Sequence, residues 1–301
     1  MAERKIPPTK HLSLYDRAQA GKRWRAPAVT DRGHVPPSDA MPRIRPLRLA
    51  EKREHTVSIV IPAKNEARNL PHVFAKLPED CEVILVDGHS TDDTISVAQD
   101  LRPDITVIGQ TRRGKGNALA CGFATAKGDF IVMLDADGSN DPAEIPRFVA
   151  ALEGGADFAK GSRFLAGGGS LDISLVRRIG NFWLNRIVNL LYGTRYTDLC
   201  YGYNAFRREC LDVMDLDASE VDGPEREAMR WGDGFEVETL INVRIAKAGL
   251  RVAEVPSFET VRHFGASNLN AFSDGLRVLR TIRAEFRGCA GNAAADSALA
   301  D

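Results

Sequence analysis

Short apolar runs alternate with amphipathic stretches from Val57 to about residue 160. Runs of this length and composition are typical of buried strands, and the stretches between them predict helices. The predicted strands are residues 57–62, 83–87, 106–108, 130–134 and 157–159, and the predicted helices are 66–77, 93–101, 116–126 and 142–152. Repeated strand–helix units with short connections predict an α/β fold whose mostly parallel, Rossmann-like sheet has helices on both faces.

The second half of the chain predicts helices at residues 176–192, 235–248 and 270–287, and a strand at 251–256. The first of these helices places Asn181, Asn185 and Asn189 on one face and apolar residues on the others. We interpret it as a core helix, with an interfacial helix lying on a membrane as the alternative. The helix at 270–287 carries four arginines, which favour a solvated face over contact with anionic lipid.

Both ends of the chain differ in composition from the middle. Residues 1–55 are rich in proline and hold thirteen lysines and arginines against six acidic residues, which predicts a disordered basic arm. Residues 288–301 are rich in small residues and predict a disordered tail. One folded domain is therefore expected at residues 56–287.

Composition limits the class of protein. The chain has 301 residues, 44% of them apolar and 27% charged, which is ordinary for a globular protein. A net charge of −1 argues against a nucleic-acid-binding protein. The five cysteines show no paired metal-ligand spacing, which favours free thiols in a reducing compartment. No signal-peptide pattern and no run of about 18 apolar residues is present, so a cytoplasmic protein is predicted.

The segment Asp135-Ala136-Asp137 follows the apolar run at 130–134. Residues two apart on a strand point to the same side, so both carboxylates are expected to leave the sheet edge together. Two carboxylates this close repel each other unless a cation lies between them, and a hard divalent ion shared with substrate phosphates suits them. The alternative is a polar turn that leads into a helix beginning at Asp141-Pro142.

Other strand ends carry polar residues as well, and ligands of parallel sheets bind beyond the carboxyl ends of the strands. These ends read Pro62-Ala63-Lys64-Asn65-Glu66, Asp87-Gly88-His89 and Arg112-Arg113-Gly114-Lys115-Gly116. No Gly-x-Gly-x-x-Gly follows the first strand, which argues against a dinucleotide cofactor, and no P-loop motif occurs. We therefore expect one crevice that collects carboxylates, a glycine-flanked lysine and a metal ion.

Together, these segments resemble the ordered motifs of inverting family 2 glycosyltransferases with the GT-A (nucleotide-diphospho-sugar transferase) fold. The branch they most resemble contains the dolichyl- and polyprenyl-phosphate mannosyl- and glucosyltransferases. The resemblance covers about residues 56–270 and implies a nucleotide-sugar half at 56–160 and an acceptor half at 161–287. One departure is Gly88, where the lipid-phosphate enzymes commonly have a second aspartate.

The resemblance also implies roles for the residues of the nucleotide-sugar half. Asp87 is expected to accept a hydrogen bond from the base, and Lys115 to assist the departing diphosphate. Asp135 and Asp137 are expected to hold Mg²⁺ or Mn²⁺ against that diphosphate. The remaining nucleotide-sugar contacts are expected from Pro62, Ala63, Glu66 and Ala136.

In the acceptor half, Arg163, Arg262 and Ser267 match positions that lie beside acceptor or phosphate groups in the family. For Arg163 the alternative is an arginine that braces the loop after it. Asp198 is a candidate general base, sugar ligand or structural anchor. Glu236 is a second candidate base, with Asp233 and Glu238 as neighbouring alternatives. Asn268 replaces the family's lysine, which removes one positive charge from an anion-binding loop.

The sequence thus predicts a metal-dependent, inverting transferase that moves a hexose from a UDP- or GDP-sugar to an acceptor. Polyprenyl phosphate is the first acceptor considered, with peripheral contact at the inner face of an anionic membrane. A soluble hydroxyl acceptor, such as a metabolite or glycan, is the alternative and would need an Asp or Glu general base. A non-catalytic nucleotide-binding module and a nucleotidyltransferase are further alternatives.

Overall fold

The computed structural model describes residues 55–223, 226, 228–265 and 271–298, and for residues 271–274 and 289–298 it describes the backbone only. Ser267 and the predicted basic arm, except its last residue, lie outside the described residues.

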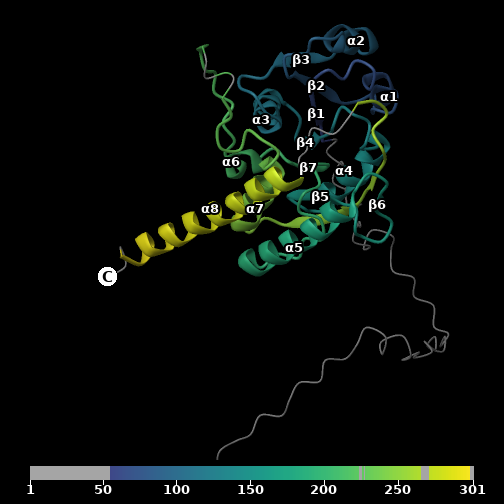
Figure 1. The fold of residues 1–301 in the computed structure, drawn as a ribbon. Helices are drawn as coiled ribbons and strands as arrows, with labels where there is room; N and C mark the ends of the chain where they lie inside the picture. Colours follow the sequence, from purple (N-terminus) through teal and green to yellow (C-terminus); the bar gives the residue numbers. More distant parts are fainter. Residues whose placement is uncertain (1–54, 224–225, 227, 266–270, 299–301) are drawn as a thin grey trace, which may run out of the picture. The chain divides into compact units, whose positions relative to one another are not determined.

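A seven-stranded sheet forms the centre of the described domain, with strand order β3-β2-β1-β4-β7-β5-β8 (Figure 1). Its strands are β1 (Val57–Ala63), β2 (Glu82–Asp87), β3 (Thr106–Gly109), β4 (Phe130–Met133), β5 (Phe158–Ser162), β7 (Asn204–Arg207) and β8 (Val252–Pro256). All neighbouring strands are parallel except β7, which runs antiparallel to β4 and β5. The predicted mostly parallel sheet is confirmed, but β7 was not predicted.

Helices cover both faces of this sheet, as predicted. They are α1 (Leu70–Phe74), α2 (Thr94–Leu101), α3 (Lys115–Thr125), the 3-10 helix η2 (Pro142–Glu144), α4 (Ile145–Glu153), α5 (Leu175–Tyr192), α6 (Cys210–Met214), α7 (Val237–Lys247) and α8 (Ala271–Ala298). Apolar side chains of α1, α2 and α4 share one core with the strands, and those of α3, α6 and α7 share a second core on the opposite face. A separate pair of two-residue strands, β6 (Gly169–Ser170) and β9 (Phe258–Glu259), is also present.

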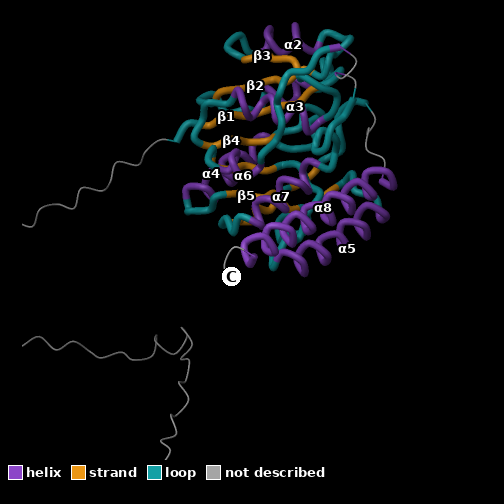
Figure 2. Tube along the Cα trace, turned by 90° about the vertical axis from the view of Figure 1, so that its left-hand side faces the viewer, coloured by secondary structure: helices purple, strands orange, loops and turns teal. Residues whose placement is uncertain are grey.

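Helices α5 and α8 lie side by side and form a further layer with α7 (Figure 2). Helix α5 has its polar stripe turned inward: the amide groups of Asn185 and Asn189 donate to the carbonyls of Thr197 and Tyr196. Its apolar side chains divide between two sides: Val188 is buried in a cluster with residues of α7 and α8, whereas Phe182 is 55% and Trp183 61% exposed. The interpretation of this segment as a core helix is therefore correct for one side only: Val188 and the asparagines pack against the protein, and the opposite side is exposed.

Two helix boundaries differ from those predicted. The helix expected at 66–77 is only the five-residue α1, because Glu66 and the residues after it form a turn in which the Glu66 carbonyl accepts from Asn69 and Leu70. At the other end, α8 continues to Ala298 through a sequence that contains five alanines, the residue of highest helix propensity. The predicted disordered tail is therefore helical through residue 298.

Candidate functional site

The ends of β1 and β2 lie side by side, because Ala63 pairs with Asp87 in the sheet register. Asp87 is the last residue of β2 and is buried, and its carboxylate accepts a hydrogen bond from the Ser90 amide. Pro62 and Ala63 are the last two residues of β1. The structure therefore brings the predicted base-binding residues to one edge of the sheet.

Asp135, Ala136 and Asp137 lie just beyond the end of β4, at the same edge of the sheet. The prediction that strand alternation orients both carboxylates is wrong, because the strand ends at Met133 and the segment turns. The Asp137 carboxylate accepts from the Ser139 amide at 2.9 Å, which fixes the turn. The helix start predicted nearby is also present, since Asp141 caps η2 through the Ala143 amide.

Each of the two carboxylates has a cationic partner from another part of the chain. Lys115 Nζ lies 2.7 Å from Asp135 Oδ1 and 2.9 Å from Glu238 Oε1. Arg262 Nη2 lies 3.2 Å from Asp137 Oδ2. Burial would lower the pKa of Lys115, but the Asp135 and Glu238 carboxylates outweigh it and hold this pKa well above its usual range. Lys115 is therefore a fixed positive charge beside Asp135.

Negative charge accumulates around this pair of cations. Burial raises the pKa of Glu66, and the carboxylates of Asp137 and Asp135 add to the effect. Among the described residues, no group of three or more His, Cys, Asp or Glu side chains is arranged to hold a metal ion. Mg²⁺ commonly takes only one or two protein carboxylates and shares the substrate's phosphate oxygens. The donor set of Asp135 and Asp137 fits that mode of binding.

The glycines beside Lys115 allow close packing of another loop. A side chain at Gly114, whose φ is +127°, or at Gly116 would overlap the backbone of Asp233 or Gly232. The Gly116 amide donates to the Asp233 carbonyl at 2.7 Å. One of the amides at the start of α3 is therefore already satisfied by the protein, and Lys115 itself is the group that faces the carboxylates.

Arg163 and Asp198 form a buried pair away from this cluster. The guanidinium donates to both oxygens of Asp198, at 2.7 and 2.9 Å, and to Glu259 at 2.9 Å. Asn181 of α5 also donates to Asp198. Asp198 is fully buried and Arg163 nearly so. Of the roles considered for Asp198, this arrangement favours the structural anchor, and the donors of Arg163 are largely engaged by the protein.

Asp233 also forms a bidentate ion pair, with the buried Arg112, which donates at 2.9 and 3.0 Å. Glu236 precedes α7 and differs from the other acidic candidates, because its Oε2 atom is buried without a hydrogen-bond partner. The carboxylate of Glu238 is bound to Lys115. Of the candidate bases in this segment, Glu236 is the one with a buried oxygen that has no hydrogen-bond partner among the described residues.

Lys160 and Asn69 are among the buried polar residues that sequence reasoning missed. Lys160 on β5 is fully buried, its ammonium nitrogen has no hydrogen-bond partner, and burial lowers its pKa. Asn69 binds the backbone of Phe264, almost two hundred residues later in the chain. Neither gave a signal in the sequence, because the partner of Asn69 is distant along the chain and the burial of Lys160 depends on tertiary packing.

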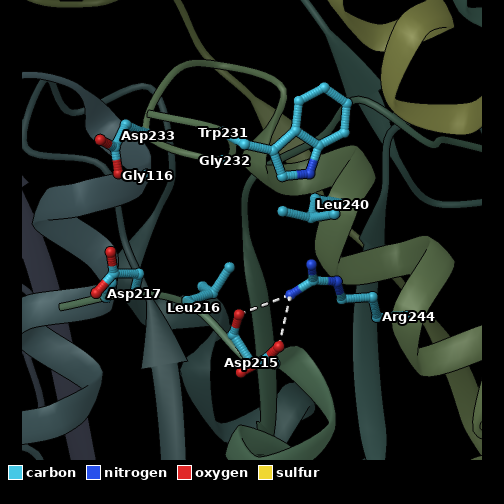
Figure 3. A pocket seen from close by; sticks show the side chains of 10 residues that line it. Gly116, Asp215, Leu216, Asp217, Trp231, Gly232, Asp233, Leu240 and Arg244 are labelled. Atoms are coloured by element: carbon cyan, nitrogen blue, oxygen red, sulfur yellow. Dashed lines mark hydrogen bonds and ion pairs between the residues drawn. The ribbon is translucent and has the colours of Figure 1, made fainter. Parts of the chain in front are cut away.

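A cavity of about 130 Å³ lies next to the start of α3 (Figure 3). Its walls include Trp231, Leu240 and Arg244, and Arg244 donates to the Asp215 carbonyl at 2.7 Å. Drug-sized ligands usually occupy pockets of about 300–1,000 Å³. This cavity is too small for a nucleotide sugar, and Asp135 and Asp137 do not line it.

Comparisons with known proteins agree with this architecture. A model of glycosyl transferase family 2 matches residues 58–214. The chain is 31% identical over 239 residues to an undecaprenyl-phosphate mannosyltransferase of Micrococcus luteus, covering 75% of this chain and 93% of that protein. It is 33% identical over 223 residues to a polyprenol monophosphomannose synthase of Mycolicibacterium smegmatis, covering 70% of this chain and 80% of that protein.

Solved structures show the same fold. Glucosyl-3-phosphoglycerate synthase from Mycobacterium tuberculosis, in complex with Mn²⁺, UDP and glucosyl-3-phosphoglycerate, superposes with a TM-score of 0.57 and 23% identity. The match covers 78% of this chain and 81% of that one. Another mycobacterial protein superposes with a TM-score of 0.60 and 21% identity, over 78% of this chain and 75% of that one.

The fold and the comparisons define the class of protein: the chain is a glycosyltransferase with the GT-A fold. It belongs to glycosyl transferase family 2.

Proposed function

We propose that this enzyme transfers a hexose from a UDP- or GDP-sugar to polyprenyl phosphate in one inverting displacement, at a site built around Asp135 and Asp137. The observation that carries the proposal is the meeting of these two carboxylates with Lys115 and Arg262 at the carboxyl edge of the sheet. The relatives named for undecaprenyl phosphate and polyprenol support the choice of acceptor.

On the donor side, Asp135 and Asp137 would hold Mg²⁺ or Mn²⁺. A divalent ion bound there would neutralise charge on the departing diphosphate. Lys115 keeps its positive charge at this point and would stabilise the same leaving group, and Arg262 would add a second cation. Asp87, at the end of β2, would accept a hydrogen bond from the nucleotide base. The nucleotide pocket would be completed by Pro62, Ala63, Glu66 and Ala136.

In the proposed reaction, an ionised phosphate oxygen of the acceptor attacks the anomeric carbon. The bond from that carbon to the diphosphate breaks, and its electron pair leaves with the nucleoside diphosphate. Such an acceptor needs no general base. The buried Arg163–Asp198 pair would then act by holding the acceptor half together, because both side chains already have protein partners.

Helix α5 supports a lipid acceptor in a second way. Its outward side chains include Ile179, Phe182 and Trp183, with Arg178 and Arg186 exposed among them. No acidic residue occurs in α5. Aromatic and apolar side chains mixed with arginine are typical of helices that lie in the interface of an anionic membrane. A second copy of this face would bring arginines against arginines, so charge favours lipid over self-association.

No helix in the described part of the chain is long and apolar enough to cross a membrane. We therefore propose a peripheral location at the inner face of the membrane, with α5 against the lipid. This location brings the enzyme to an acceptor whose polyprenyl chain stays in the bilayer.

A soluble hydroxyl acceptor is the second candidate, and two observations favour it. The Oε2 atom of Glu236 has no hydrogen-bond partner in the described part of the chain, and a general base for a hydroxyl needs an oxygen that is free to accept a proton. Asn268, in place of a lysine, also lowers the positive charge available for an anionic acceptor. Under this candidate Glu236 would take the hydroxyl proton, and Ser267 and Arg262 would contact the acceptor.

The two candidates separate in one experiment. The full chain is incubated with UDP-glucose or GDP-mannose, Mg²⁺ or Mn²⁺, and either polyprenyl phosphate in detergent or a panel of soluble sugars and glycerate derivatives. Release of nucleoside diphosphate and the chemical form of the labelled sugar are measured. A lipid-extractable product supports the proposal, whereas label only in a water-soluble product supports the second candidate. Release of pyrophosphate would contradict both.

A further inference from the structure

The segment Thr260–Phe264, here called the Arg262 segment, crosses from the Asp137 turn to helix α1. At one end the Thr260 amide donates to the Ser139 carbonyl at 2.9 Å, and its hydroxyl donates to the Gly138 carbonyl at 3.1 Å. In the middle, the His263 amide approaches the Asp137 carbonyl at 3.3 Å. These contacts place the Arg262 guanidinium beside the Asp137 carboxylate.

The other end of the Arg262 segment is held by Asn69. The Asn69 Oδ1 atom accepts from the Phe264 amide at 3.0 Å, and its Nδ2 atom donates to the Phe264 carbonyl at 3.2 Å. The second proton of Nδ2 goes to the Glu66 carboxylate. Asn69 is almost fully buried and has no unused donor. A single carboxamide thus binds both backbone groups of one residue in a distant loop.

Side chains around Asn69 reinforce the same contact. The Arg68 guanidinium lies 4.0 Å from the centre of the Phe264 ring, and the His72 and His263 rings stack with centroids 4.4 Å apart. Arg68, Asn69 and His72 all come from α1 or from the turn before it. The Arg262 segment is therefore fixed at both ends of Arg262, by two independent sets of bonds.

We propose that Asn69 is a positioning residue for Arg262: by clamping the Phe264 backbone, it holds the guanidinium at Asp137, where the departing diphosphate is bound. The inference deepens the proposed function and rests on its assignment of the diphosphate to Asp135 and Asp137. Arg262 has a long side chain, so a small shift of the backbone at residues 263–264 moves the charge away from the site. Misplacement of a charged group by about 1 Å can cost a hundredfold in rate.

The clamp is tested first without catalysis, by hydrogen exchange on the full chain. Asn69→Ala is expected to raise the exchange rate of the peptide that contains the Phe264 amide, because that amide loses its acceptor. Arg102→Ala is the matched control: Arg102 also clamps a loop, through the carbonyls of Pro78, Glu79 and Cys81, but far from Arg262 in the sequence. Unchanged exchange at Phe264 in Asn69→Ala would overturn the clamp.

The link to Arg262 is tested by a double-mutant cycle in kcat/KM for the nucleotide sugar. Asn69→Ala alone is expected to lower this value about ten- to a hundredfold. In an Arg262→Ala background, the same change is expected to cost less than about twofold, because there is no guanidinium left to position. Additive losses would show that Asn69 does not act through Arg262 and would overturn the proposal. If the wild type transfers no sugar, the proposed function fails, while the exchange measurement still decides the clamp.

Discussion

Arg163 holds both carboxylate oxygens of the fully buried Asp198 in a bidentate ion pair, with N–O distances of 2.7 and 2.9 Å. The Arg163 guanidinium also donates to Glu259. Burial lowers the pKa of Arg163, but the Asp198 and Glu259 carboxylates raise it by more, so the guanidinium stays charged. Removing one partner of such a pair leaves an uncompensated buried charge, which typically costs about 3–5 kcal/mol.

We predict that Asp198→Ala lowers the free energy of unfolding by about 3–5 kcal/mol. Urea unfolding followed by circular dichroism measures it. Asp104→Ala is the control, because Asp104 pairs with Arg102 at an exposed position and its loss should cost less than about 1 kcal/mol. An Asp198→Ala protein as stable as the wild type but without activity would instead identify Asp198 as a catalytic residue.

Lys115 should be required for turnover because it places a permanent positive charge beside Asp135. Lys115→Met keeps most of the side-chain length and removes the charge, and is expected to lower kcat about a hundredfold. Steady-state release of nucleoside diphosphate measures it. Lys76 pairs with Asp141 at a more exposed position, so Lys76→Met is the control and should retain activity. Equal activity of both variants would exclude the role given to Lys115.

The outward face of α5 should bind anionic vesicles. Phe182→Ser with Trp183→Ser removes two exposed aromatic side chains and is expected to weaken binding to phosphatidylglycerol vesicles about tenfold or more. Trp231→Ser is the matched control, because Trp231 is 50% exposed but belongs to the loop before α7. Co-sedimentation measures the bound fraction. Wild-type protein that stays in the supernatant, or an equal loss in the control, would contradict the lipid assignment.

The buried Lys160 should make the free energy of unfolding depend on pH. Burial lowers its pKa from the ordinary value of 10.5, so the unfolded chain binds more protons and stability rises as the pH approaches that value. Lys160→Met should therefore raise the melting temperature at neutral pH, since Asp198 and Glu254 keep Arg163 and Thr197 as partners. The difference between variant and wild type should shrink as the pH rises to about 10. A difference that is constant with pH would contradict a charge-burial cost.

The sequence was sufficient to predict the carboxyl edge of the sheet. Lys115 and Asp135 lie where parallel strands end, and such ends meet in space whatever the details of packing. The predicted orientation of the Asp137 carboxylate was wrong, because the chain turns after β4. The hydrogen bond from the Ser139 amide orients this carboxylate, and strand alternation does not. Local patterns give the edge of a sheet but not the path of the chain beyond it.

Pairings between distant segments could not be predicted. Glu259 reaches Arg163 across 96 positions of the chain. For α5, periodicity separated the asparagine face from the apolar face but did not decide which one faces the protein. The carbonyls of residues 196 and 197 decide it, because they accept from Asn189 and Asn185 and leave the side with Phe182 and Trp183 exposed.

The central claim is that Asp135 and Asp137 bind a divalent ion together with the diphosphate. Isothermal titration calorimetry of UDP and GDP, with Mg²⁺ or Mn²⁺ and then with chelator, tests it most directly. For the wild type we predict that the metal tightens binding of one nucleotide at least about tenfold, and that Asp135→Asn and Asp137→Asn each remove this gain. Metal-dependent tightening that persists in both variants would contradict the account.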